Sequence, residues 1–111
     1  MATKRYLGEF EQMVLLAALH LKEDAYGVRL TEEISERSGR EVSRGALYVT
    51  FDRLERKGLI GSRYGDASDT RGGRRRRYVS VTAEGVEALR ESREALLGLW
   101  RGLEAELDGH A

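Results

Sequence analysis

Hydrophobic residues recur every three to four positions near the start of the chain, and this spacing predicts a helix over residues 8–22. Additional apolar residues beside the periodic ones widen the hydrophobic stripe. A stripe this wide predicts burial on two sides, one against the domain core and one against a partner. The periodic positions are Leu7, Phe10, Val14, Ala17 and Leu21, and the widening positions are Met13, Leu16 and Leu19.

Two more amphipathic helices follow in close succession. The first is predicted from about residue 25 to Ser38, with Gly39 as a left-handed stop. The second is predicted over 43–57, where Ser43 can cap the first turn and Gly58 can end the helix. The short gap between them is typical of a helix-turn-helix connection. The predicted core residues are Val28, Leu30 and Ile34 in the first helix and Leu47, Phe51 and Leu54 in the second.

The pattern then changes to the alternation of β-strands. Strands are predicted over 60–64 and 76–81, and the turn-forming residues between them indicate a hairpin with a long tip. Thr82 can cap a last helix, predicted to extend from Ala83 to about Leu107. A helix of this length would reach about 37 Å, longer than the domain needs. Its apolar seam, which predicts a homodimer, consists of Val86, Leu89, Leu96, Trp100, Leu103 and Leu107.

This order of elements predicts a mainly α fold with a small β-hairpin wing. A winged helix-turn-helix would occupy residues 1–82, and a long C-terminal dimerisation helix would occupy residues 83–111, the two forming one compact unit. We expect the first and last helices to carry the dimer interface. The predicted interface residues are Phe10, Val14, Leu89, Leu96, Trp100 and Leu103.

Composition and charge narrow the possible functions. The 111 residues suffice for one domain with a core, and 41% apolar residues exclude a disordered chain. No apolar stretch is long enough to span a membrane, and the absence of cysteine and of a secretion signal fits the cytoplasm. The net charge is zero, but residues 44–77 hold ten Lys/Arg and four Asp/Glu, a net +6. Such a concentrated basic surface is typical of a protein that binds a polyanion.

The basic segment coincides with the third helix and the hairpin, which predicts binding to double-stranded DNA. Arg44 is suited to guanine or phosphate, and the small Gly45 lets the helix approach the groove floor. Tyr48 offers a hydroxyl to the sugar-phosphate backbone. Arginines beside glycines at the hairpin tip are suited to a narrow minor groove. The predicted DNA-binding residues are Ser43, Arg44, Gly45, Tyr48, Arg53, Lys57, Arg71, Gly72, Arg74 and Arg76.

Trp100 is the only tryptophan, and two interpretations of it stay open. It can simply pack in the dimer interface, or it can line a pocket for a small planar effector together with Phe10 and Met13. The sequence contains no arrangement of residues that is typical of a catalytic site: no nucleophile lies beside a base, and only two distant histidines are present. We therefore expect no catalytic site, no metal site and no cofactor.

Four groups of motifs make the chain similar to a known family. They lie at residues 7–16, at 24–28, at 45–48 with 52–59, and at 71–75 through 78–82. With these motifs the chain resembles PadR-family transcriptional regulators of the short subfamily, which has a single C-terminal helix. The resemblance implies a dimeric repressor whose third helix reads a palindromic operator and whose wing flanks it. It also implies that an effector can bind near the dimer interface.

The sequence therefore predicts a DNA-binding repressor that acts as a homodimer and is released by a small planar effector. An alternative from another class is a winged-helix protein-interaction module that binds neither an effector nor DNA. The charge of the wing and Arg44 argue against that alternative. An enzyme has no candidate site.

Overall fold

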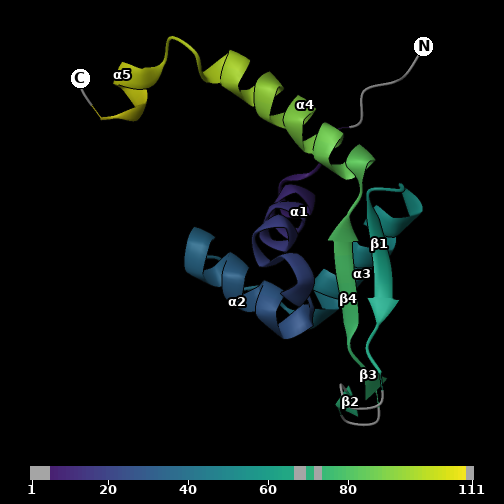
Figure 1. The fold of residues 1–111 in the computed structure, drawn as a ribbon. Coiled ribbons are helices and arrows are strands. Elements are labelled where there is room, and N and C mark those ends of the chain that lie inside the picture. The colour runs from purple at the N-terminus through teal and green to yellow at the C-terminus, as the bar shows by residue number, and fades with distance from the viewer. Residues whose placement is uncertain (1–5, 67–69, 72–73, 110–111) are drawn as a thin grey trace.

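The computed structural model describes residues 6–66, 70–71 and 74–109. Its elements follow one another as helices, then a hairpin, then helices (Figure 1). In chain order they are α1 (Glu9–Leu21), η1 (Lys22–Asp24), α2 (Gly27–Ser38), α3 (Arg44–Arg56), β1 (Ile60–Tyr64), β2 (Thr70–Arg71), β3 (Arg74–Arg75), β4 (Arg77–Val81), α4 (Ala83–Trp100) and α5 (Glu104–Leu107). The predicted fold class, mainly helical with a small β-hairpin, is confirmed.

Local signals start and stop the helices where the sequence predicts. Ser43 caps α3, because its hydroxyl accepts a hydrogen bond from the Ala46 amide at 3.1 Å. Thr82 caps α4 in the same way and accepts from the Gly85 amide at 3.0 Å. Gly39, with φ of 77°, ends α2 in the left-handed conformation that glycine adopts without strain.

One core joins α1, α2, α3 and the base of the hairpin. The predicted core residues of α3 are fully buried. Two residues of α2 stand out: Val28, predicted in the core, is only half-buried and lies outside the core cluster, whereas Glu33 is buried and forms an ion pair with Arg37. The largest fully buried side chains are Phe51, Leu15, Leu30, Leu47, Leu54, Leu59 and Val14.

The hairpin is fixed to the start of α2. Strands β1 and β4 pair antiparallel from Ile60↔Val81 to Tyr64↔Arg77, and β2 pairs with β3 further out. In Figure 1 the hairpin extends away from the helices, with β2 and β3 near its tip. The Val79 amide donates to the Ala25 carbonyl at 2.9 Å, which ties β4 to the segment before α2. The wing base is therefore anchored in the core.

The last helix differs from prediction. It was expected to continue to about Leu107, but α4 ends at Trp100 and a short α5 follows. Arg101 leaves the helical region with ψ of 128°, and Gly102 takes φ of 91°, which an L side chain rarely adopts. The apolar periodicity continues through this break, so the seam alone predicts a longer helix than forms. Figure 1 shows α4 leading away from the other helices and α5 at its far end.

Helix α4 is held at its beginning rather than along its length. Gly85 packs so closely that a Cβ built there would lie 2.3 Å from the Leu59 carbonyl oxygen. Ala88 and Leu89 are buried, whereas residues 93–100 are exposed. Among the described residues, no helix is long and apolar enough to cross a membrane.

Candidate nucleic-acid interface

The outer face of α3 is open and carries the residues that the sequence singles out. Ser43, Arg44, Gly45 and Arg53 are exposed. Tyr48 lies beside them with its ring edge packed on Phe51, the centroids 5.3 Å apart. No atom would come within 4 Å of a Cβ built on Gly45, so this part of the helix surface is unobstructed. The N-terminal half of α3 can therefore approach another molecule closely.

The wing arginines do not share one environment. Arg75 is exposed, whereas Arg76 is half-buried and stacks on Tyr26, with its guanidinium carbon 4.2 Å from the ring centroid. The structure describes only the backbone of Arg71, in β2, and of Arg74, in β3. Both residues were predicted as DNA contacts, and those contacts stay predictions. Gly72, also predicted, lies outside the described residues.

Arg77, at the start of β4, has a structural role that the sequence does not reveal. Its guanidinium pairs with Asp52 at 3.0 Å and Glu55 at 3.1 Å, and it donates to the Ser62 hydroxyl at 3.0 Å. Burial opposes the charged form, but the hydrogen bonds to Asp52 and Glu55 outweigh it and raise the pKa of Arg77. Arg77 therefore joins the wing to α3.

Lys57 also has an intramolecular partner. The sequence predicts it as a DNA contact, but its ammonium lies 2.7 Å from the Glu11 carboxylate of α1. Burial raises the pKa of Glu11, but the hydrogen bonds from Lys57 and from the Gly8 amide outweigh that effect, so the net pKa is lowered. This pair joins α1 to the end of α3, and the DNA contact of Lys57 stays a prediction.

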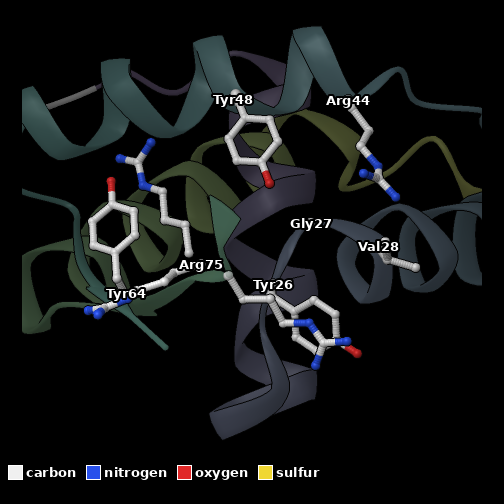
Figure 2. A pocket seen from close by; sticks show the side chains of 9 residues that line it. Tyr26, Gly27, Val28, Arg44, Tyr48, Tyr64 and Arg75 are labelled. Atoms are coloured by element: carbon white, nitrogen blue, oxygen red, sulfur yellow. The ribbon is translucent and has the colours of Figure 1, made fainter. Parts of the chain in front are cut away.

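A cavity of about 470 Å³ lies where α2, α3 and the wing meet. Tyr48 and Arg44 project into it from α3 toward the start of α2 (Figure 2). A Cβ on Gly27 would lie 2.9 Å from the Tyr48 hydroxyl, so glycine makes room for that side chain. We call this the tyrosine–arginine cavity; its lining residues are Tyr26, Gly27, Val28, Arg44, Tyr48, Tyr64, Arg75, Arg76 and Arg77.

The predicted dimer residues divide into two groups. Val14 is fully buried within its own chain and Leu89 is only 8% exposed, so both pack mainly in the core, and their place in an interface stays a prediction. Phe10 is half-buried against the same core. By contrast, Leu96, Trp100 and Leu103 are 46–47% exposed. Of the predicted dimer residues, only this second group is exposed to solvent: Leu96 and Trp100 lie on α4, and Leu103 follows its end.

Trp100 lines a groove between α1 and α4, and its neighbours differ from those predicted. Phe10 and Met13, expected to share an effector pocket with Trp100, instead pack against the core and do not line this groove. The reason is helical phase, because the α1 residues that face α4 lie on another side of α1. The lining residues are Gln12, Leu16, Leu19, Val86, Leu89, Arg90, Arg93, Leu96, Leu97 and Trp100.

The described ranges gather no cluster of metal-binding side chains. No group of three His, Cys, Asp or Glu residues there could hold a metal ion. The clustered side chains of the interface are arginines and tyrosines, which bind anions and nucleic acids rather than activate a nucleophile.

Together, the geometry defines a winged helix-turn-helix protein: α2 and α3 form the helix-turn-helix, and β1 and β4 form the wing. The chain belongs to the transcriptional regulator PadR-like family, whose model matches residues 15–91. Members of this family are transcriptional regulators that bind DNA, and they are not enzymes.

Individual relatives agree with this assignment. The transcriptional regulator Rv3488 of Mycobacterium tuberculosis is 42% identical over 84% of this chain and 85% of its own. A PadR family transcription regulator from Clostridium difficile has a similar structure, with a TM-score of 0.70 and 25% identity over 90% of this chain and 99% of that chain. Another from Eggerthella lenta gives a TM-score of 0.67 and 30% identity, covering 89% and 86%.

Proposed function

We propose that this chain is a sequence-specific transcriptional repressor that binds a palindromic operator as a homodimer in the cytoplasm. Each α3 would enter the major groove, and the two would lie about one helical turn (~34 Å) apart. The observation that carries this proposal is the open N-terminal face of α3, with Arg44, Gly45 and Tyr48 exposed. In a chain of zero net charge, this face belongs to the segment, residues 44–77, that carries a net charge of +6.

The exposed apolar surface along α1 and α4 supports a homodimer. Leu16, Leu96, Leu97 and Trp100 are each 47–51% exposed and line one groove. A contiguous apolar surface of this kind is unfavourable in water and marks an interaction site. Because α4 projects from the body of the chain, two copies can pair along it while both α3 helices stay open (Figure 1).

An effector would act through the same groove. A small planar apolar molecule against Trp100 would change the packing of the paired α4 helices. The spacing of the two α3 helices would then change, because α4 is anchored by Gly85 and Leu89 to the body that carries α3. The effector would thus shift a population from a DNA-binding to a non-binding form.

A gel shift tests the DNA-binding part of this proposal. The probe is the DNA upstream of the chain's own gene, at moderate salt, with an unrelated duplex as competitor. We expect a discrete complex that resists the competitor. In contrast, Arg44→Ala should blur the preference for the upstream DNA over the competitor. The absence of any complex, even in dilute buffer, would favour the protein-interaction module.

Sedimentation equilibrium tests the dimer independently of DNA. The unaltered chain is expected to be a dimer at micromolar concentration, and Leu96→Asp should shift it toward monomer because a carboxylate would be buried in the apolar interface. Exposed Glu84→Asp is the matched control, because it keeps a charge that already faces solvent. A wild-type chain that stays monomeric at these concentrations would contradict the dimer.

A further inference from the structure

One exposed apolar side chain of α3 is not accounted for by the proposed dimer. Val49 is 56% exposed and is not one of the side chains packed against the hydrophobic core. Among the described residues, every other exposed leucine or valine lies on α1, on α4 or after α4. That is the part of the chain that we propose pairs with a second copy, and Val49 lies on a different helix.

Val49 lies at the centre of the outer face of α3. Residues three or four positions apart share one face of a helix. The neighbours of Val49 on its face, all of them exposed, are Gly45, Ala46, Asp52 and Arg53. Gly45 and Ala46 carry nothing larger than a methyl group, so Val49 projects furthest from the N-terminal half of this face. A duplex that receives α3 in its major groove would therefore bring base edges against Val49.

Val49 and Tyr48 point in different directions although they are consecutive. Tyr48 projects into the tyrosine–arginine cavity between α3 and the start of α2 (Figure 2). Successive residues of an α-helix are about 100° apart around its axis, so Val49 points away from that cavity and does not line it. In the free protein its side chain faces solvent.

Valine at this position does not serve the stability of the free protein. A β-branched side chain is a weaker helix former than alanine, because the helix restricts its rotamers. Burial of the side chain normally offsets this loss, and Val49 is not buried. An isopropyl group at the centre of this face is suited to an apolar partner outside the chain.

We propose that Val49 contacts the C5 methyl group of one thymine in each half of the operator. This methyl group is the apolar feature that base pairs present in the major groove, whereas the other features that distinguish them there are hydrogen-bond donors and acceptors. Val49 cannot pair with a donor or an acceptor, so a polar base edge against it would lose its water without gaining a partner. The inference rests on the proposed DNA-binding function and names one residue that sets its sequence preference.

Deoxyuridine substitution tests the contact, because uracil lacks only the C5 methyl group and keeps the base pairing of thymine. The probe is the shortest fragment of the upstream DNA that the unaltered chain protects from nuclease. One symmetric pair of thymines is replaced at a time, and fluorescence anisotropy measures the affinity. One such replacement is expected to weaken the binding of the unaltered chain about fourfold per half-site, because one methyl group is no longer buried. The slope of log K against log salt should not change, because no phosphate contact is lost.

Variants of the full chain show whether Val49 makes this contact. Val49→Ala should bind the thymine and deoxyuridine probes equally at the position that the unaltered chain distinguishes. Val49→Ile keeps a branched apolar side chain and should retain the discrimination. The matched control is Leu99→Ala, which truncates an exposed aliphatic side chain on α4 and should also retain it. Circular dichroism checks that each variant is folded, and Val49→Ala should be at least as stable as the unaltered chain.

The outcomes separate the thymine contact from the proposed function. Equal affinity of the unaltered chain for every thymine and deoxyuridine probe would overturn the contact and leave DNA binding intact. Undiminished discrimination by Val49→Ala would also overturn it, because another residue would then contact the methyl group. An unaltered chain that binds no duplex would contradict the proposed function itself, and the contact with it.

Discussion

Replacing Arg77 by methionine should destabilise the protein measurably, although the residue belongs to the arginine run of the wing. Methionine keeps the aliphatic contact with neighbouring side chains but removes the ion pairs to Asp52 and Glu55 and the hydrogen bond to Ser62. The two carboxylates are 65% and 47% exposed, so each pair contributes only about 0.2–1 kcal/mol. The hydrogen bond to Ser62 adds about 1 kcal/mol.

The summed loss is about 2 kcal/mol, which should lower the melting temperature by about 8–12 °C for a domain of this size. Thermal unfolding followed by circular dichroism, at one fixed protein concentration, measures it. Arg75→Met is the matched control: Arg75 is exposed and forms no ion pair among the described residues, so its loss should change the melting temperature little. Equal destabilisation by the two variants, or none by either, would refute the conclusion that Arg77 stabilises the contact between the wing and α3.

Other predictions follow from single contacts. Gly85→Ala should lower the free energy of unfolding by several kcal/mol, because the new Cβ would lie 2.3 Å from the Leu59 carbonyl oxygen. Thermal denaturation measures the loss. Gly45→Leu should abolish DNA binding in a gel shift yet leave thermal stability unchanged or slightly higher, because the side chain meets only open space in the free protein. The lowered pKa of Glu11 means that its contribution to stability is complete above the ordinary carboxyl pKa and is lost as pH falls through the lower folded value. Denaturation of Glu11→Gln should therefore depend less on acid pH than that of the unaltered chain; an identical dependence would contradict the pairing.

The elements that depend on local signals could be predicted from the sequence. The caps at Ser43 and Thr82 and the stop at Gly39 act within one turn of their own helices, and all three form as expected. Strand β1 was also predicted with its observed bounds, Ile60–Tyr64. Where hydrophobic spacing and a terminal signal agree, the sequence determines the element.

The end of α4 could not be predicted because two signals conflict there. Apolar spacing continues from Leu96 through Leu107, which favours one long helix, whereas Gly102 favours a break. Backbone conformation at Gly102 decides the outcome, with φ of 91°. A periodic pattern reports which residues share a face but not whether the backbone stays helical between them.

The roles of individual basic residues depend on partners far away in the sequence. Arg77 pairs with Asp52, 25 positions earlier, and Lys57 pairs with Glu11, 46 positions earlier. No local pattern distinguishes these two residues from exposed Arg75. The net charge of the segment could therefore be counted from the sequence. Which of its basic side chains form ion pairs within the chain could not.

The tyrosine–arginine cavity was missed for the same reason. Tyr26 and Gly27 lie in one of the motifs that carry the family resemblance, yet the sequence does not reveal that they face Tyr48 across a cavity. The only local signal was a glycine at the first position of a helix, where it is not a favoured helix former. The close approach of the Tyr48 hydroxyl explains that glycine.

Hydroxyl-radical footprinting of the upstream DNA tests most directly whether α3 is the reading helix of a two-fold dimer. The account predicts two protected patches about one helical turn (~34 Å) apart, related by the symmetry of the DNA sequence, and their loss in Gly45→Leu. A single patch, no protection, or an unchanged footprint with Gly45→Leu would contradict it.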